Sequence, residues 1–232
     1  MRYRIVKNDI APRLGVKELA IYNKCYLGVS INNPFFRDQY LGLLMKWMAN
    51  HFDKSLIIIG DYLNRINEMI IHGKSETDAI EDSIRKGDDI EDKIKIAISL
   101  LPQDKFTVYR WIDLIRKYPD ANDEKMKLIS MAKKNPEFAE QIQISASDFI
   151  DRLLNRGQRL SFSKTEAIEK SKMYLFEEMA LFSILIQKGY KVQIYPGTQL
   201  RVLKLLANGA FPSLGSPLKN GIYVDLKIKK SK

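Results

Sequence analysis

Residues 24–34, KCYLGVSINNP, hold the stretch that decides the fold. Lys24–Val29 is short, apolar and partly aromatic or β-branched, and the turn-rich SINNP follows it. This pattern is typical of a buried strand that ends in a loop. A second run of the same kind, SLIIIG at 55–60, predicts a second buried strand. Between the two, the apolar residues from 36 to 48 recur at helical spacing, which predicts a connecting helix.

The same alternation continues along the chain. Helices are predicted at 61–73, 77–101, 123–133, 136–156, from Ser163 or Thr165 to Gly189, and 199–207, and strands at 106–110, 191–195 and 221–228. Strands that alternate with helices predict an α/β fold, with a mainly parallel sheet and helices on both faces. Ligands of such sheets bind beyond the carboxyl ends of the strands. The loop at Ser30 and the turn at Tyr195-Pro196 are therefore candidates for one site.

Composition bounds the class of protein. The 232 residues are 45% hydrophobic, and no repeat or low-complexity stretch interrupts them, so we expect a single domain over residues 1–232. No apolar run has the length of a signal peptide or a membrane span, which favours a cytoplasmic protein. Cys25 is the sole cysteine, and this excludes a disulfide framework or a cysteine metal cluster within one chain.

The net charge of +10 is concentrated at the two ends of the sequence. Residues 188–232 hold nine Lys or Arg against one acid, Asp225, and residues 1–30 hold six against two. This surplus indicates a site for a polyanion if the fold brings the two ends together. The alternative is a solvated surface with a flexible basic tail at 227–232, KIKKSK.

Nucleotide-driven and metal-driven chemistry have no sequence support. No GxxxxGK[ST] loop occurs, no GxGxxG follows a predicted strand, and no HExxH is present. His51 and His72 lie far apart and are interpreted as ordinary surface or helix-end residues. We therefore expect no cofactor and no metal.

Ser30 is a candidate nucleophile. It ends an apolar strand, where its hydroxyl can project towards a ligand, and Gly28 permits close approach of a substrate. The surroundings are not a nucleophile elbow, because position 32 is Asn and not Gly. The alternative is a serine that satisfies loop amides, and Asn33 has the same alternative as a turn residue before Pro34.

Tyr174 and Glu178 lie four residues apart on one predicted helix and share a face. A carboxylate beside a phenol suits an amino group, because the acid can hold an ammonium and later accept its proton. The alternative is a surface Tyr–Glu pair. Tyr195, at a strand end, can donate a hydrogen bond to the same ligand or be a half-buried tyrosine with a wet hydroxyl.

Taken in order, several segments resemble the cyclodipeptide synthases. They are LGVSINN at 27–33, IRKGDDIEDKIKIAI at 84–98, TVYRWID at 107–113, KNPEFAEQI at 134–142, YLFEE at 174–178 and IYPG at 194–197. The resemblance implies a Rossmann-like domain similar to the catalytic domains of class I aminoacyl-tRNA synthetases. It also implies a monomer that needs no nucleotide.

The resemblance implies a function as well. Ser30 would accept the aminoacyl group of a first aminoacyl-tRNA, a second would give a dipeptidyl-enzyme, and ring closure would release a diketopiperazine. Tyr174 and Glu178 match the pair that positions the substrate ammonium, and Gly28 and Tyr195 match further site residues. Asn33 together with Tyr195-Pro196 mixes the signatures of the two branches of the family, and Tyr-Pro places the chain in the second.

The resemblance also implies a surface for tRNA. The family's long helix is commonly basic, but here residues 77–101 are net acidic, with Arg85, Lys86, Lys93 and Lys95 as the basic residues. Either these four face one way, or the C-terminal Lys227, Lys229 and Lys230 carry more of the tRNA contact. The runner-up interpretation is a non-catalytic tRNA-binding protein on a synthetase-like fold. A third interpretation, a nucleotide-dependent transferase, is disfavoured because the sequence contains no phosphate-binding loop.

Overall fold

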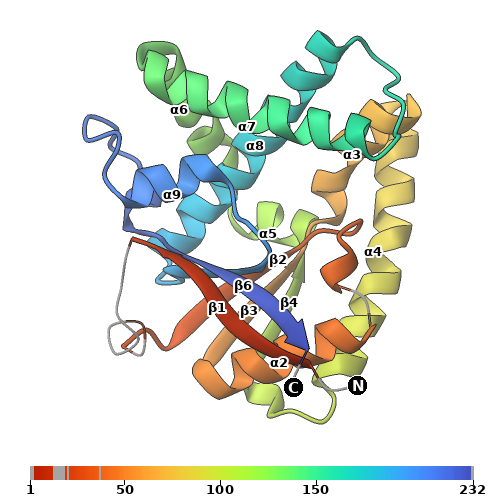
Figure 1. The fold of residues 1–232 in the computed structure, drawn as a ribbon, viewed down its shortest axis with the longest axis vertical. Coiled ribbons are helices and arrows are strands. Elements are labelled where there is room, and N and C mark those ends of the chain that lie inside the picture. Colours follow the sequence, from red (N-terminus) through yellow and green to blue (C-terminus); the bar gives the residue numbers. More distant parts are fainter. Residues whose placement is uncertain (1–2, 13–18, 20, 37, 231–232) are drawn as a thin grey trace.

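The strands of the described residues form one six-stranded sheet. The structure, a computed structural model, describes residues 3–12, 19, 21–36 and 38–230. The strands are β1 (Tyr3–Ala11), β2 (Lys24–Val29), β3 (Lys54–Ile59), β4 (Phe106–Arg110), β5 (Val192–Pro196) and β6 (Ile222–Lys230). Their order is β1-β6-β5-β2-β3-β4, and only β1 runs antiparallel to its neighbour. The predicted α/β fold with a mainly parallel sheet is confirmed (Figure 1).

The described α-helices are α2 (Asp38–His51), α3 (Asp61–His72), α4 (Glu76–Ile98), α5 (Trp111–Lys117), α6 (Ala121–Lys134), α7 (Pro136–Asn155), α8 (Lys164–Gln187) and α9 (Arg201–Ala207). Side-chain caps mark the start of three of these described helices, α4, α7 and α8. Ser163 caps α8, because its hydroxyl accepts from the Glu166 N–H while the Glu166 carboxylate accepts from the Ser163 N–H. Gly73, with φ at 62°, ends α3 in the left-handed conformation that favours glycine.

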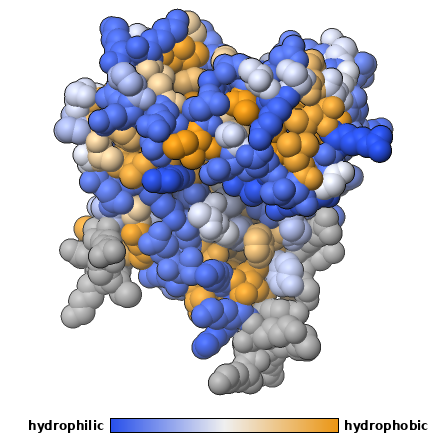
Figure 2. All heavy atoms as spheres, turned by 45° about the horizontal axis from the view of Figure 1, so that its top comes forward, coloured by the Kyte–Doolittle hydropathy of each residue, from blue (hydrophilic) through white to orange (hydrophobic). Residues whose placement is uncertain are grey.

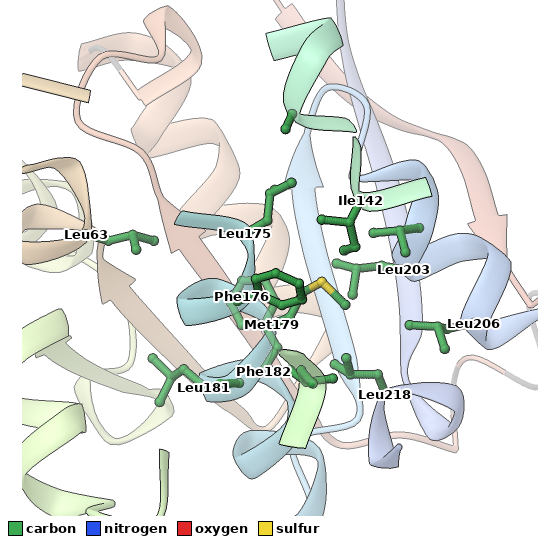
Figure 3. Packing of buried hydrophobic residues seen from close by; sticks show 14 of the residues in the cluster. Leu63, Ile142, Leu175, Phe176, Met179, Leu181, Phe182, Leu203, Leu206 and Leu218 are labelled. Atoms are coloured by element: carbon green, nitrogen blue, oxygen red, sulfur yellow. The ribbon is translucent and has the colours of Figure 1, made fainter. Parts of the chain in front are cut away.

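Helices cover both faces of the sheet, as expected. The side chains of β2 alternate, so Leu27 packs into a cluster with α2 and α4, whereas Tyr26 packs into a larger cluster around α8. Figure 3 shows Met179 and Phe182 of α8 at the centre of the larger cluster, with Leu203 of α9 to one side. The site helix α8 is thereby fixed against the sheet.

The predicted flexible tail at 227–232 is wrong for residues 227–230. These residues extend β6 and pair with β1, from Val6↔Lys227 to Tyr3↔Lys230. The physical reason is the alternation of apolar and basic residues from Leu226 to Lys229, a strand pattern that β1 can complete with backbone hydrogen bonds. Residues 231–232 lie outside the described residues.

Strand β1 and helix α5 were not predicted from the sequence. In β1 the apolar residues do not form a compact run, and the strand depends on β6 for pairing. The β1–β6 pairing places the basic ends of the sequence side by side, with Arg4 opposite Lys229. The fold therefore brings the two basic ends of the sequence together, as a polyanion site formed by both would require.

The surface is mainly hydrophilic, with separate apolar patches between the charged residues (Figure 2). Exposed large side chains include Met126 on α6 and Met173 on α8. In the part of the chain that the structure describes, every helix is too short or too polar to cross a bilayer.

Candidate active site

Ser30 and Tyr195 lie at the same edge of the sheet. Ser30 directly follows β2, and Tyr195 lies near the end of β5, which runs parallel to β2. Asn33 Nδ2 donates a hydrogen bond to Tyr195 Oη over 2.7 Å, although the two residues are 162 positions apart in the sequence. Pro196 is buried as the last residue of β5. The structure therefore brings together the loop and the strand end that the sequence singled out.

Two phenols from different elements lie close enough to the Ser30 hydroxyl for it to affect their pKa values. Burial raises the pKa of Tyr174 well above its usual value, the Glu178 charge raises it further, and hydrogen bonding with Ser30 offsets part of the rise. Burial likewise raises the pKa of Tyr195, offset in part by hydrogen bonds with Ser30 and Asn33. Both phenols therefore keep their protons at neutral pH and can act as hydrogen-bond donors.

Glu178 is a carboxylate without a protein partner among the described residues. It lies one helical turn after Tyr174 on α8, and burial raises its pKa to about 7. At neutral pH the side chain exists in both protonation states. A group with this pKa can hold an ammonium and accept a proton from it.

The adjacent Glu177 shows the opposite situation. Arg65 donates two hydrogen bonds to its carboxylate, over 3.0 and 2.9 Å, and Lys125 lies 3.7 Å away. The Arg65 guanidinium also stacks over the Tyr62 ring at 4.1 Å. Glu177 is therefore engaged in a structural ion pair, and Glu178 is the acid available to a ligand.

Gly28 and Tyr26 share with Ser30 the sheet face that α8 covers, because every second residue of a strand points the same way. A Cβ at Gly28 would lie 3.8 Å from Phe182 Cζ, an ordinary contact, so glycine here leaves space and avoids no clash. Tyr26 packs against Phe182 with ring centroids 5.1 Å apart and the ring planes tilted by 52°. Its hydroxyl is buried and has no hydrogen-bond partner in the described structure. The sequence analysis did not single out Tyr26, but strand alternation would have placed it on this face.

The basic residues of α4 are engaged in ion pairs. Lys86 Nζ lies 2.7 Å from Glu68 and 2.9 Å from Asp82, which also pairs with Arg85. Lys95 Nζ lies 2.8 Å from Glu91, and Lys93 also has an interaction partner. These ion pairs therefore join the basic residues of α4 to acids of α4 itself and, at Glu68, of α3.

The lysines at the end of β6 differ from those of α4. Lys227 and Lys229 are exposed, and the described residues offer them no ion-pair partner. Strand alternation places both lysines on the same face of β6 as Tyr223, which packs into the α8 cluster. Both lie beyond the end of β5, because Pro196, the last residue of β5, pairs with Leu226. The side chain of Lys230 and all of Lys232 lie outside the described residues.

The loop after Ser30 is held by residues that the sequence analysis did not single out. Asn32 Nδ2 donates to Asn64 Oδ1 over 3.3 Å, and the Gly60 N–H donates to the Val29 carbonyl over 3.0 Å. The polar doublet Asn32-Asn33 is the only sequence signal for such a tether.

Other reactive side chains carry no site chemistry. Burial raises the pKa of the Cys25 thiol to about 12, which keeps it in the unreactive protonated form. Within the described ranges, no three His, Cys, Asp or Glu side chains gather closely enough to hold a metal ion.

Comparison with known proteins connects this geometry to a family. The sequence pattern of the family described as cyclodipeptide synthase matches residues 22–206. A comparison with curated protein sequences gave no match.

Solved structures share the fold at low identity. A CDPS from Fluoribacter dumoffii is 18% identical, with a TM-score of 0.82 over 100% of both chains. A Mycobacterium tuberculosis protein, whose structure is described as showing that cyclodipeptide synthetases are related to type I tRNA synthetases, is 16% identical. Its TM-score is 0.64 over 91% of this chain and 87% of that one. A cyclodipeptide synthase from Candidatus Glomeribacter gigasporarum, bound to Phe-tRNAPhe, is 16% identical, with a TM-score of 0.64 over 90% and 88%. Because the family pattern covers most of the sequence, the chain belongs to the cyclodipeptide synthase family.

Proposed function

We propose that the protein joins the aminoacyl groups of two aminoacyl-tRNAs into a cyclic dipeptide through an acyl-enzyme on Ser30. The observation that carries this proposal is the gathering of Ser30, Tyr174 and Tyr195, with Asn33 hydrogen-bonded to Tyr195, beside the unpaired Glu178. The relative from Candidatus Glomeribacter gigasporarum bound to Phe-tRNAPhe supports aminoacyl-tRNA as the substrate. An aminoacyl ester is already activated, so the transfer requires no ATP.

In the first step Ser30 Oγ attacks the ester carbonyl of the first aminoacyl-tRNA. The new Oγ–acyl bond forms as the bond to the ribose oxygen breaks, and the serine proton passes to that oxygen. Tyr195 is placed to assist, because its oxygen accepts the Asn33 hydrogen bond and its own proton remains free to point towards Ser30. The products are deacylated tRNA and an aminoacyl ester on Ser30.

In the second step Glu178 makes the substrate amine nucleophilic. Its carboxylate accepts a proton from the ammonium of the aminoacyl-enzyme, and a pKa of about 7 allows this transfer near neutral pH. The freed amine attacks the ester of the second aminoacyl-tRNA, which gives a dipeptidyl ester on Ser30 and a second free tRNA. The terminal amine then attacks the Ser30 ester, so the ring closes and the serine hydroxyl is restored.

We also assign the chain to the Tyr-Pro branch of the family, on the basis of Tyr195 followed by Pro196. Proline at this position offers no side-chain base, so the proton of Ser30 has to leave through the ribose oxygen or through Tyr195. Asn33 then has a positioning role, because its amide orients the Tyr195 phenol. Gly28 leaves the space that a substrate beside Ser30 needs.

For tRNA binding we propose a larger contribution from the end of β6 than from α4. Lys227 and Lys229 are exposed at the edge of the sheet where the Ser30 loop lies, and Lys230 extends the same strand. The basic residues of α4, Arg85, Lys86, Lys93 and Lys95, have to share their charge with neighbouring side chains. A monomer in the cytoplasm, where aminoacyl-tRNA is available, is part of the proposal.

The deciding experiment offers the protein a mixture of aminoacyl-tRNAs and searches for cyclic dipeptides by mass spectrometry. The proposal expects a product with wild type and none with Ser30→Ala. A matched control is Ser213→Ala, because Ser213 is an exposed serine outside the site. Binding of tRNA without any product would instead support a non-catalytic tRNA-binding protein.

A further inference from the structure

We infer that Asn64 of α3 is a positioning residue that fixes the Ser30 loop through Asn32. The inference rests on the proposed function, because it assigns a role to Asn64 in the acylation of Ser30. The loop is a tight turn in which the Asn33 N–H donates to the Ser30 carbonyl over 3.1 Å. A turn of this kind leaves its two ends free to move unless other groups hold them.

Three contacts hold this turn, and each comes from a different place. The Gly60 N–H holds the Val29 carbonyl at 3.0 Å, just before Ser30. The Tyr195 hydroxyl holds the Asn33 side chain at 2.7 Å, on the β5 side. Asn64 holds the middle of the turn by accepting the 3.3 Å hydrogen bond from Asn32. Without it, the turn would be fixed at its ends alone.

The Asn64 amide can hold Asn32 in one orientation only. Its oxygen accepts from Asn32 and, over 3.2 Å, from Asn67. Its nitrogen donates to Glu68 over 3.3 Å and to Ser83 over 3.2 Å. A flipped amide would place donor against donor at Asn32 and Asn67, and acceptor against acceptor at Glu68. Asn64 is 4% exposed, so water cannot replace these contacts easily.

The base of this network is rigid because Glu68 is held by two lysines. Lys74 and Lys86 donate to its two oxygens over 2.9 and 2.7 Å. Burial raises the pKa of Glu68, but the hydrogen bonds from both lysines outweigh burial and the net pKa is lowered. Glu68 is therefore ionised at neutral pH, so its oxygens can only accept, and this fixes the Asn64 nitrogen as the donor.

The tether at Asn32 acts on position more than on stability. Asn32 is exposed, so its single hydrogen bond adds little to the free energy of unfolding. Misplacement of a nucleophile by a fraction of an ångström to 1 Å nevertheless lowers a rate by about 10- to 100-fold. Removal of the tether should therefore slow acylation of Ser30 while the fold and tRNA affinity persist.

The test measures single-turnover labelling of Ser30 from radiolabelled aminoacyl-tRNA, together with tRNA affinity and deuterium exchange of residues 30–36. We expect Asn32→Ala and Asn64→Ala each to slow labelling about 10- to 100-fold. Combined, they should slow it no further, because they remove the same contact. Asn67→Ala is the matched control, because Asn67 also donates to Asn64 but lies outside the loop. It should label at the wild-type rate.

Exchange in the loop should rise for Asn32→Ala and Asn64→Ala and stay unchanged for Asn67→Ala. A normal labelling rate in Asn32→Ala, or additive losses in the double variant, would overturn the role of Asn64. Absence of label on wild type would instead overturn the proposed function. In that case loop exchange alone still decides whether Asn64 holds the turn.

Discussion

Glu68 on α3 and Glu178 on α8 lie on neighbouring helices, but their pKa values are shifted in opposite directions. Glu68 is 1% exposed, yet its pKa is lowered, because hydrogen bonds from Lys86 and Lys74 outweigh burial. Glu178 is more exposed than Glu68, yet desolvation without a partner raises its pKa to about 7. Burial alone therefore does not decide the charge of a carboxylate in this protein; the neighbouring cation does.

The difference separates structure from chemistry. Around Glu68 the acids and bases of α3 and α4 satisfy one another, so this region fixes the position of the loop without reacting. On the face of α8 that meets Ser30, the titratable groups are desolvated and lack cationic partners among the described residues. An incoming ammonium can supply the missing charge.

The largest effect is expected at Ser30. Ser30→Ala should abolish the covalent aminoacyl-enzyme and leave tRNA binding nearly intact, because the hydroxyl is the acceptor of the acyl group. Radiolabel from aminoacyl-tRNA should survive an acid quench on wild type and be absent from the variant. Persistent labelling of Ser30→Ala would remove this residue from the mechanism and deprive the α8 face of its role.

A pair of isosteric changes tests the two carboxylates against each other. Glu178→Gln should lower turnover by about 10²–10⁴, because the amide cannot accept the ammonium proton. Glu68→Gln should instead lower the free energy of unfolding by about 1–3 kcal/mol, since two lysines lose their shared anion. Turnover and chemical denaturation of both variants are the measurements. Comparable losses of turnover in the two variants would contradict a structural role for Glu68 and a catalytic role for Glu178.

The two acids should also respond to pH in opposite directions. The pKa of Glu178 is raised from 4.5 to about 7, so its protonated form is favoured in the folded state. Its contribution to stability is full below pH 4.5 and is lost as pH rises towards 7. Turnover needs the carboxylate, so it should fall about tenfold per pH unit below 7.

The folded pKa of Glu68 is lowered, so its contribution is present above pH 4.5 and is lost as pH falls through the folded value. In Glu178→Gln the remaining turnover should no longer increase as the pH rises towards 7. In Glu68→Gln the free energy of unfolding should decrease less as the pH falls below 4.5. A pH–rate profile and denaturation at several pH values record the two effects. A rate that does not change between pH 5 and 8 would contradict the assignment of Glu178.

The smallest effect is expected in tRNA affinity. Lys227→Gln with Lys229→Gln should reduce the slope of log K against log salt by about 1.5, at roughly 0.7–0.9 per phosphate contact. Lys86→Gln with Lys93→Gln should reduce it by no more, because Lys86 is held by acids and Lys93 has a partner of its own. Substitution is preferable to deletion, because residues 227–230 pair with β1. An unaltered slope in the β6 variant would leave tRNA binding to other residues.

Much of the fold could be predicted from local sequence. Apolar runs and capping residues predicted the parallel strands and most helices, since β2 and β3 are buried on both faces and α8 has a complete capping box. Strand β1 could not be predicted, because its place depends on β6 at the other end of the chain. The supposed tail at 227–230 was wrong for the same reason.

The candidate site, like the fold, could be predicted only where local sequence determines it. Ser30, Asn33 and Tyr195 could be grouped because parallel strands end at one edge, and the structure places their side chains in contact. Asn64 could not be found, since its role depends on contacts with α4 and with the Ser30 loop. The pairing of Lys86 with Glu68 was equally hidden, because Glu68 lies on another helix, whereas the pairing of Lys86 with Asp82 follows from helical spacing.

The pairing of β1 with β6 has a consequence for biosynthesis. Within the described sheet β1 has no neighbour but β6, so β1 has to wait for a strand that is synthesised about two hundred residues later. Such long-range pairing forms slowly and late in folding. During translation β1 and the free edge of β5 therefore both remain open until β6 inserts between them. A nascent chain gains its basic edge only in that final docking step, after the scaffold around Ser30 has begun to assemble.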